Sequence, residues 1–593
     1  MKSYKFVSHD REYTTWVVYD SVTLLEEDNN VPNSIWNGFD PIRYKLFSGD
    51  VYEYHEYRIN VLHSSVRSMP IIPGVLVLNT TQLYGKHKDK YLYKCIPDDK
   101  RLPSFLIPYN KRIEFVKKTS NKYIVFKYNH WTDKHPQGTI VNVLGDVEEL
   151  ESFYEYQLYC KSLYASIQQF TKATMNKLKE NTEREYLHGM IKKYDIIDRT
   201  HEYVFTIDSV QTRDYDDAMS IVTLNEENKT YKVSIYIANV AMWMEELSLW
   251  GSFSERISSI YLPDRKRPML PTVLSECMCS LCEGTIRMAL CLDLTIMNNE
   301  ILAYDFKNTY VKVKENYRYG SDKLERNGDY IHLLSVMQRL AQNPEYSYTS
   351  EIKNSYDMVA YSMIFMNYYA ACEMIKYKNG IYRSVTINKN VVIPTHLPSS
   401  ITGFLTHWHS SSGQYQIYDD KEKHEFLKLD NYVHITSPIR RLIDLLNMSV
   451  LQNNLNLPGK PTSPEYNVFI QTWLSRMEYI NTTVRSIRKI QNDSNLLKHC
   501  LSKERSDNNT VYDGYIFDKI TRNDGLYQYV VYLSSINMVS RITSRQDFEE
   551  YCIQQFNILI FNDESSLKRK IRLSHIENPS DKDKPTENSE KNK

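Results

Sequence analysis

The chain has no excess of charge of either sign, because 73 lysines and arginines balance 73 aspartates and glutamates among its 593 residues. Net charge therefore gives no general attraction to a polyanion, and a nucleic-acid site would need its basic groups gathered in one channel. The sequence also lacks a signal peptide and an apolar run long enough to span a bilayer. We therefore expect a soluble cytoplasmic protein with no membrane partner.

Cysteine is also scarce. Nine cysteines in a chain of this length predict no disulfide framework, which fits a reducing compartment. Three of them, Cys277, Cys279 and Cys282, have a spacing that could bind zinc if Cys291 supplied the fourth ligand. Incidental packing is the stronger interpretation of these thiols.

Aspartate, by contrast, is concentrated in one short run. Four aspartates fall within ten positions: Asp208, Asp214, Asp216 and Asp217. Residues 203–207 and 218–222, on either side of the run, are apolar and predict buried strands. Carboxylates at the ends of buried strands are costly unless they are paired or coordinated. Because Mg²⁺ prefers oxygen ligands and leaves positions for phosphate, the spacing favours a metal site for phosphate chemistry.

The aspartate run has two other interpretations. A hydrated acidic turn is the common meaning of such a run, and on spacing alone it stands at roughly even odds with the metal site. An EF-hand calcium loop does not fit, because no glycine or bidentate glutamate falls at the required offsets and the flanks are not helical.

Two further segments make a family resemblance specific. The run from Asp208 to Asp217 resembles the catalytic signature of the RNase II/RNB exoribonuclease family. Residues 259–271 are similar to the next characteristic block of that family, and residues 434–446 contain its Thr-Ser-Pro-Ile-Arg-Arg motif. Three long motifs in the family's order are implausible by chance. The resemblance extends over roughly residues 45 to 575.

The resemblance implies an α+β multidomain fold, which agrees with a length sufficient for about four domains. We expect two N-terminal OB/cold-shock-like β-barrels, a central α/β RNB catalytic domain and a C-terminal S1 (OB) β-barrel, without the N-terminal nuclease domain of exosome-type relatives. The expected units are an N-terminal extension (1–48), a first cold-shock-like domain (49–105), a second one (106–165), the RNB domain with helical connectors (166–505), the S1 domain (506–576) and a disordered tail (577–593).

The resemblance also implies an activity. We expect a Mg²⁺-dependent hydrolytic exoribonuclease, with Mn²⁺ as a substitute, that degrades single-stranded RNA from 3′ to 5′ and releases nucleoside 5′-monophosphates. Two cations about 4 Å apart would activate the water and stabilise the leaving oxygen. By the same resemblance, Asp208 and Asp217 are direct metal ligands and Asp214 acts through water. Asp216 lies closest to the metal and the attacking water.

Three further residues receive roles from the resemblance. Arg440 holds a non-bridging phosphate oxygen, because a guanidinium can stabilise the charge that grows there, and Arg441 is the weaker candidate. Tyr261 stacks on nucleotides in the channel. Tyr319 contacts the scissile region, with Tyr317 as the competitor one alternation away.

The chain also departs from the family pattern. Ala360 and Tyr361 stand where the family has a pair of acids, and Asn239 replaces the aspartate of a His-Ile-Ala-Asp-Val element. The loss of those acids leaves open how the terminal nucleotide is handled, and with it the rate and the length of the product. Two alternative functions also stay open. One is a catalytically impaired RNA-binding or regulatory protein, and the other is a subunit that is active only within an RNA-decay complex. An RNA-decay complex is thus a candidate partner, and otherwise we expect a monomer.

Overall fold

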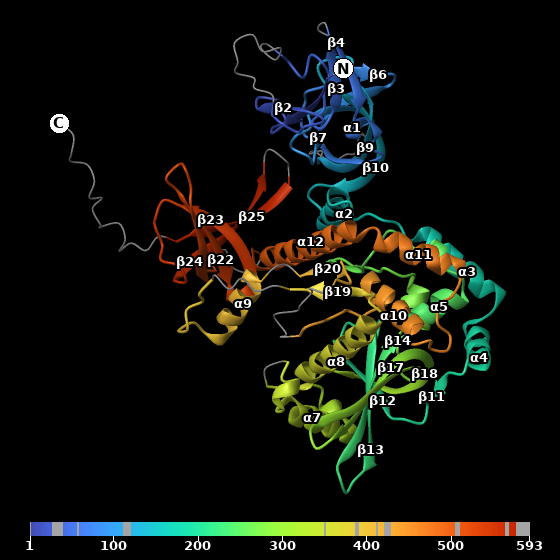
Figure 1. Ribbon diagram of the computed structural model, residues 1–593. Coiled ribbons are helices and arrows are strands. Elements are labelled where there is room, and N and C mark those ends of the chain that lie inside the picture. Colours follow the sequence, from blue (N-terminus) through green and yellow to red (C-terminus); the bar gives the residue numbers. More distant parts are fainter. Residues whose placement is uncertain are drawn as a thin grey trace. The chain divides into compact units, whose positions relative to one another are not determined.

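The computed structural model describes residues 2–26, 39–55, 58–110, 120–348, 351–385, 391–410, 413–419, 429–504, 510–563 and 568–576. The chain divides into two compact units, both drawn in Figure 1. One unit comprises Met1–Tyr164, Leu262–Asp264 and Asn492–Lys593, and the other comprises Ala165–Tyr261 and Arg265–Gln491. Among the described residues, no helix is long and apolar enough to cross a membrane. The tail predicted to be disordered, 577–593, lies outside the described residues.

The first N-terminal sheet is antiparallel, with strand order β2-β1-β3-β4. Its strands are β1 (Ser3–Ser8), β2 (Trp16–Asp20), β3 (Val51–His55) and β4 (Arg58–His63), and the short helix α1 (Ser65–Ser68) follows. Strand β1 pairs directly with β3, with Tyr4 opposite Tyr52. Residues 1–48, predicted as an extension, therefore supply two strands of this sheet.

The second sheet closes into a barrel, because β5 pairs with both β9 and β7. Its strands are β5 (Ile72–Leu76), β6 (Lys86–His87), β7 (Lys90–Pro97), β8 (Phe105–Tyr109), β9 (Lys122–His130) and β10 (Gln137–Asp146). The predicted domain boundary at 105/106 falls inside β8, which pairs with β7 from Tyr91–Tyr109 to Cys95–Phe105. The turn before β8 connects two strands of one sheet and does not separate two domains.

The chain after β10 is helical. The first helices are α2 (Leu150–Cys160) and α3 (Gln168–Glu180), and α4 (Glu183–Lys193) follows. Thr182 begins α4 with a capping box, because its side chain accepts from the Glu185 amide and Glu185 binds the Thr182 amide in return.

The second unit is built around a sheet that also closes on itself. Strands β12, β13, β14, β17 and β18 form a ring, because β18 pairs in parallel with β12 and antiparallel with β17 (Figure 1). The bounds are β11 (Ile197–Asp198), β12 (Val204–Asp208), β13 (Asp217–Asn225), β14 (Thr230–Ala238), β17 (Ile286–Met297) and β18 (Glu300–Arg318). The length of β18 allows one strand to close the ring.

Helices and two small hairpins complete this unit. The helices are α5 (Val240–Glu246), α6 (Asp322–Glu325), α7 (Gly328–Ala341), α8 (Ser355–Lys376), α9 (Ser399–His409), α10 (Leu442–Asn454), α11 (Pro464–Leu474) and the start of α12 (Met477–Glu504). The hairpins are β15 (Ile260–Tyr261) with β16 (Lys266–Arg267), and β19 (Ile381–Ser384) with β20 (Gln414–Ile417). A π-helix, η2 (Val273–Met278), follows the first hairpin.

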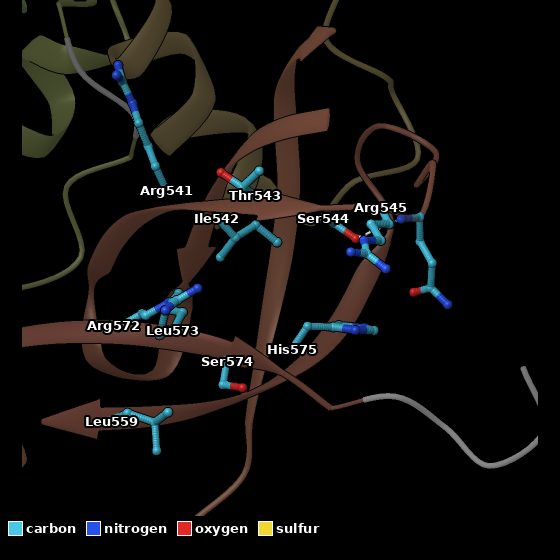
Figure 2. A pocket seen from close by; sticks show the side chains of 11 residues that line it. Arg541, Ile542, Thr543, Ser544, Arg545, Leu559, Arg572, Leu573, Ser574 and His575 are labelled. Atoms are coloured by element: carbon cyan, nitrogen blue, oxygen red, sulfur yellow. Dashed lines mark hydrogen bonds between the residues drawn. The ribbon is translucent and has the colours of Figure 1, made fainter. Parts of the chain in front are cut away.

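The C-terminal strands form a five-stranded antiparallel sheet of order β23-β22-β21-β24-β25. They are β21 (Tyr512–Thr521), β22 (Tyr527–Leu533), β23 (Met538–Ser544), β24 (Ile553–Asp563) and β25 (Lys568–His575). A hollow of about 520 Å³ lies between the edge strands β23 and β25 (Figure 2). Arg541, Arg545, Arg572 and His575 are among the side chains that line it.

Candidate active site

The four aspartates gather at one end of the closed ring. Asp208 is the last residue of β12, and Asp217 is the first residue of β13. Both strands lie where the apolar runs before and after the aspartates predicted them. Asp214 and Asp216 lie on the loop between the two strands, so the sequence run becomes a cluster at the strand ends.

The loop is fixed by the segment that contains the clustered cysteines. The Ser280 hydroxyl accepts from the Tyr215 amide at 2.9 Å and donates to the Arg213 carbonyl at 3.2 Å. The Leu281 amide donates to the Tyr215 carbonyl at 3.0 Å. Within the described ranges, no group of three His, Cys, Asp or Glu side chains is placed to hold zinc. The segment therefore packs against the aspartate loop.

Asp216 is buried and bonded to the predicted phosphate-binding arginine. Its Oδ2 accepts from Arg440 Nε at 2.9 Å, and its Oδ1 accepts from the Ile439 amide at 3.1 Å. Arg440 Nη2 donates to Ser437 Oγ at 2.8 Å. The Arg440 side chain is still 42% exposed, and in the described part of the chain its Nη1 has no hydrogen-bond partner. Asp216 thus orients an arginine that retains a free donor.

Asp214 is also paired with a cation. Lys266 Nζ lies 3.2 Å from Asp214 Oδ1, and the Tyr261 hydroxyl donates to Asp214 Oδ2 at 3.3 Å. The Tyr261 ring is exposed, and its amide donates to Gln491 Oε1 at 3.1 Å. Tyr261 therefore presents a ring to solvent directly beside the acidic cluster.

Asp208 and Asp217 have no cation bonded to them among the described residues. Asp208 Oδ2 is buried and has no hydrogen-bond partner there. Burial, with the charges of Asp216 and Asp214, raises the pKa of Asp208 to about 7 against the pull of Thr206 and Arg440. Burial, with the charge of Asp208, raises the pKa of Asp217 to about 7. These two carboxylates repel each other and are uncompensated in the sense that neither forms an ion pair among the described residues.

The pKa of Asp216 stays raised although its carboxylate is paired with an arginine. Burial raises its pKa to about 7, although Arg440 and the Ile439 amide act in the opposite direction. The cluster as a whole is therefore short of positive charge. Such an environment is typical of a functional site.

The donor set fits a divalent cation in part. Hard cations take carboxylate oxygens, and Asp208 and Asp217 offer them uncompensated. In the described residues, however, no three acidic, His or Cys side chains converge as a ready cage. The reason is visible in the bonds above, because Asp214 is bound to Lys266 and Asp216 to Arg440. Asp208 and Asp217 are the residues that would hold the cation.

Tyr319, one of the predicted RNA contacts, lies at the same cluster. Its amide donates to the Asp208 carbonyl at 3.0 Å, and burial with the charges of Asp217 and Asp208 raises the pKa of its hydroxyl. The competitor Tyr317 is buried and bonds Tyr203 at 2.9 Å instead. Tyr319, directly after the end of β18, therefore lies beside the aspartates. Its role in catalysis stays a prediction.

Arg441 is occupied elsewhere. Its Nη2 donates to Asp444 Oδ1 at 2.7 Å, and the same oxygen accepts from the Ser437 amide at 2.8 Å. Asp444 is fully buried and lies in the first turn of α10. This pair fixes the turn that carries Arg440. The sequence motif contained Asp444, but no spacing indicated that it would hold the turn.

Two of the three residues that depart from the family pattern, Tyr361 and Asn239, make hydrogen bonds within the fold. Tyr361 is buried, and its hydroxyl donates to the Tyr346 carbonyl at 2.8 Å. Ala360, its neighbour on α8, is exposed. Asn239 accepts from the Met242 amide at 3.2 Å and thereby caps α5. In the contacts of the described residues, neither Tyr361 nor Asn239 touches an aspartate of the cluster.

A second charged cluster lies on the same ring, and its acids are fully matched. Glu202 is buried, binds Arg199 and lies 2.7 Å from Lys232 Nζ. Asp293 lies 2.7 Å from Arg199 Nη2 and accepts from Ser234 at 2.6 Å. Burial alone would raise the pKa of Glu202, but Lys232 and Arg199 lower it to about 2.

The fold and the site together define a multidomain protein that joins an OB barrel to a closed sheet with an acidic, arginine-bearing centre. Residues 196–345 match the family model described as the RNB domain. Residues 92–156 match the Dis3-like cold-shock domain 2 (CSD2). The chain therefore contains an RNB domain and a cold-shock OB domain, and the predicted RNB-family relationship is confirmed.

Curated relatives match over part of their length. A segment of 205 residues is 30% identical to DIS3-like exonuclease 2 of Schizosaccharomyces pombe and covers 33% of this chain and 21% of that protein. A segment of 201 residues is 24% identical to Ribonuclease R of Chlamydia muridarum and covers 34% of this chain and 28% of that protein. The match spans less than a third of the length of either relative.

Solved structures extend the likeness of fold to nearly the whole chain. Mycoplasma genitalium RNase R, in complex with ribose methylated single-stranded RNA, gives a TM-score of 0.65 at 16% identity and covers 96% of this chain and 100% of that one. Yeast Ssd1, described as a pseudonuclease, gives a TM-score of 0.57 at 14% identity over 83% of this chain and 67% of that one. The same fold therefore occurs in a ribonuclease and in a pseudonuclease, so the fold alone does not indicate activity.

Proposed function

We propose that this chain is a divalent-metal-dependent exoribonuclease that hydrolyses single-stranded RNA from 3′ to 5′ and releases nucleoside 5′-monophosphates. One observation carries the proposal: two uncompensated aspartates, Asp208 and Asp217, lie in one cluster with an arginine whose Nη1 is free. A site made only to stabilise the fold would match its buried acids with cations, as the cluster around Glu202 does.

A divalent cation held by Asp208 and Asp217, Mg²⁺ or in its place Mn²⁺, would supply an activated water and neutralise phosphate charge. Arg440 offers Nη1 to a non-bridging phosphate oxygen, where charge grows in the transition state. Asp216 and Ser437 hold the guanidinium in place before the substrate arrives. In this arrangement Asp216 acts through Arg440. Its place closest to the metal and the attacking water stays a prediction.

Two tyrosines and the barrels would guide the RNA. The exposed ring of Tyr261 suits stacking on a base, and Tyr319 lies against Asp208 for contact near the scissile phosphate. The cold-shock barrel and the C-terminal sheet, which we interpret as an S1 domain, would bind the single strand before it reaches the site. We place the activity in the cytoplasm.

A second candidate is an RNA-binding protein without catalysis, as the likeness to yeast Ssd1 suggests. The replacement of the acid pair by Ala360 and Tyr361 favours it, and the retention of all four aspartates with Arg440 opposes it. A subunit that acts only inside an RNA-decay complex is a third arrangement of the same site.

The test uses the purified 593-residue chain, Mg²⁺ and single-stranded RNA labelled at its 5′ end. The wild type should produce a ladder that shortens from the 3′ end, and a circular RNA of the same sequence should stay intact because it has no end. Asp216→Asn should abolish the ladder. Asp305→Asn, at an exposed site on β18, is the matched control and should leave the ladder unchanged. Equal binding of RNA by all proteins without any cleavage would favour the non-catalytic candidate.

A further inference from the structure

A small hairpin holds Asp214 from one side. Tyr261 on β15 and Lys266 on β16 are directly opposite each other in the register, so their side chains leave the hairpin on the same face. Lys266 Nζ lies 3.2 Å from one oxygen of Asp214, and the Tyr261 hydroxyl lies 3.3 Å from the other. Both oxygens of Asp214 therefore already have protein partners.

The ammonium of Lys266 bridges two acids. Besides Asp214, it lies 2.7 Å from Oε1 of Glu276, which belongs to the π-helix η2. The Lys266 side chain is only 21% exposed, so its charge is poorly screened by water. A fixed monovalent cation thus occupies the position where two carboxylate oxygens would otherwise receive a hard metal ion.

We propose that Lys266 is a positioning residue that fixes Asp214 and takes the place of a second metal ion on that side of the cluster. Arg440 pairs with Asp216 in the same way. The two remaining acids, Asp208 and Asp217, carry two negative charges, which one divalent cation neutralises. The protein therefore binds one divalent cation per chain at this site, where two-metal chemistry alone would place two.

The inference rests on the proposed function for the presence of a cation, and it is tested without RNA. Mn²⁺ is titrated into the cation-free protein, and bound ions are counted by equilibrium dialysis and by the loss of the free Mn²⁺ electron paramagnetic resonance signal. The wild type should bind one ion per chain. Lys266→Met should bind two, because Asp214 and Glu276 then face an empty cation position.

Three variants isolate the charge of Lys266 from its bulk. Lys266→Arg keeps a cation and should return the count to one, whereas Lys266→Gln keeps polarity without charge and should behave as Lys266→Met. The double variant Lys266→Met with Glu276→Gln removes one of the two acids and should bind one ion. Lys323→Met, which breaks an exposed 2.6 Å ion pair with Glu315, is the matched control and should bind one.

Two ions in the wild type, or one ion in both Lys266→Met and Lys266→Gln, would overturn the inference. Thermal unfolding of each variant verifies that the catalytic unit is folded before ions are counted. The RNA assay is read separately. The predicted ion counts without cleavage of RNA would leave the role of Lys266 standing and reject the proposed function.

Discussion

The closed ring of β12, β13, β14, β17 and β18 carries two charged clusters, and the pKa values of their acids are shifted in opposite directions. In the cluster around Glu202, the acids are matched by Arg199 and Lys232, and the pKa of Glu202 is lowered to about 2. At the aspartate loop, burial and mutual repulsion raise the pKa values of Asp208 and Asp217 to about 7. One sheet therefore carries a saturated cluster, in which each acid is paired with a cation, and an unsaturated cluster, in which Asp208 and Asp217 are not.

The difference lies in the number of cations and not in burial, since both clusters contain buried acids. A buried acid with enough cations and hydrogen bonds contributes to a fixed structure. A buried acid without them is tolerated only where something outside the chain completes it, or where the fold accepts the loss of stability. The two clusters should therefore respond oppositely when one acid is neutralised.

The largest effect is expected at the saturated cluster. Glu202→Gln should lower the free energy of unfolding by about 3–5 kcal/mol, because it leaves the charges of Arg199 and Lys232 partly uncompensated in a buried site. Urea unfolding, followed by the fluorescence of the buried Trp243 and Trp250 in the same unit, measures the change.

Glu226→Gln, at an exposed position after β13, is the control for that change and should stay within about 0.5 kcal/mol of the wild type. Mn²⁺ binding by folded Glu202→Gln should equal that of the wild type. A change in ion count would show that the two clusters are one site, and the comparison would fail.

The next effect concerns the arginine of the unsaturated cluster. Arg440→Lys keeps the charge but loses the fork that binds Asp216 and Ser437 while Nη1 stays free, so we expect kcat to fall by about 10²–10³-fold. Single-turnover cleavage of RNA under saturating protein measures the chemical step apart from binding. Arg339→Lys, on α7, should have no effect. An unchanged kcat with a raised KM would assign Arg440 to binding alone.

Much of the fold was accessible from the sequence because the local patterns are strong. The strands that end at Asp208 and begin at Asp217 follow directly from apolar runs interrupted by acids. The boundary at 105/106 was wrong in position because a turn inside a sheet and a turn between domains have the same composition. The pairing of β1 with β3 joins residues about 50 positions apart, and no local signal reports such a pairing.

The sequence predicted the aspartates of the site but not all of the residues that bond to them. The family resemblance predicted that Arg440 and Tyr319 belong near the acids, but it did not predict which acid Arg440 or Lys266 would bind. Lys266 lay within a recognised block and still received no role, because its contact with Asp214 depends on a hairpin meeting a loop about 50 positions away in the chain. Asp444 was missed for the same reason, since its contact with Ser437 appears only when the turn before α10 folds.

The smallest effect has the opposite sign to the first. Asp217→Asn removes one of two carboxylates that repel each other, so in the absence of divalent cations it should raise the free energy of unfolding at pH 8, by on the order of 1 kcal/mol. The measurement is the same urea unfolding experiment, with a chelator present. Asp305→Asn, at an exposed site, should leave the stability unchanged.

The pH dependence fixes the origin of that gain. The pKa of Asp217 is about 7 in the folded chain and 3.8 as its ordinary value, so between about pH 4 and 7 the folded state keeps a proton that the unfolded state has lost. The contribution of Asp217 to stability therefore falls as pH rises through this window and is constant above it. The advantage of Asp217→Asn should shrink as the pH falls through this window and disappear below about pH 4, where the carboxyl is protonated in the folded and the unfolded state. Adding Mn²⁺ at pH 8 should reverse the sign, because the wild type gains a bound cation and the variant has lost a ligand. A gain as large at pH 5 as at pH 8 would trace the effect to packing and not to charge.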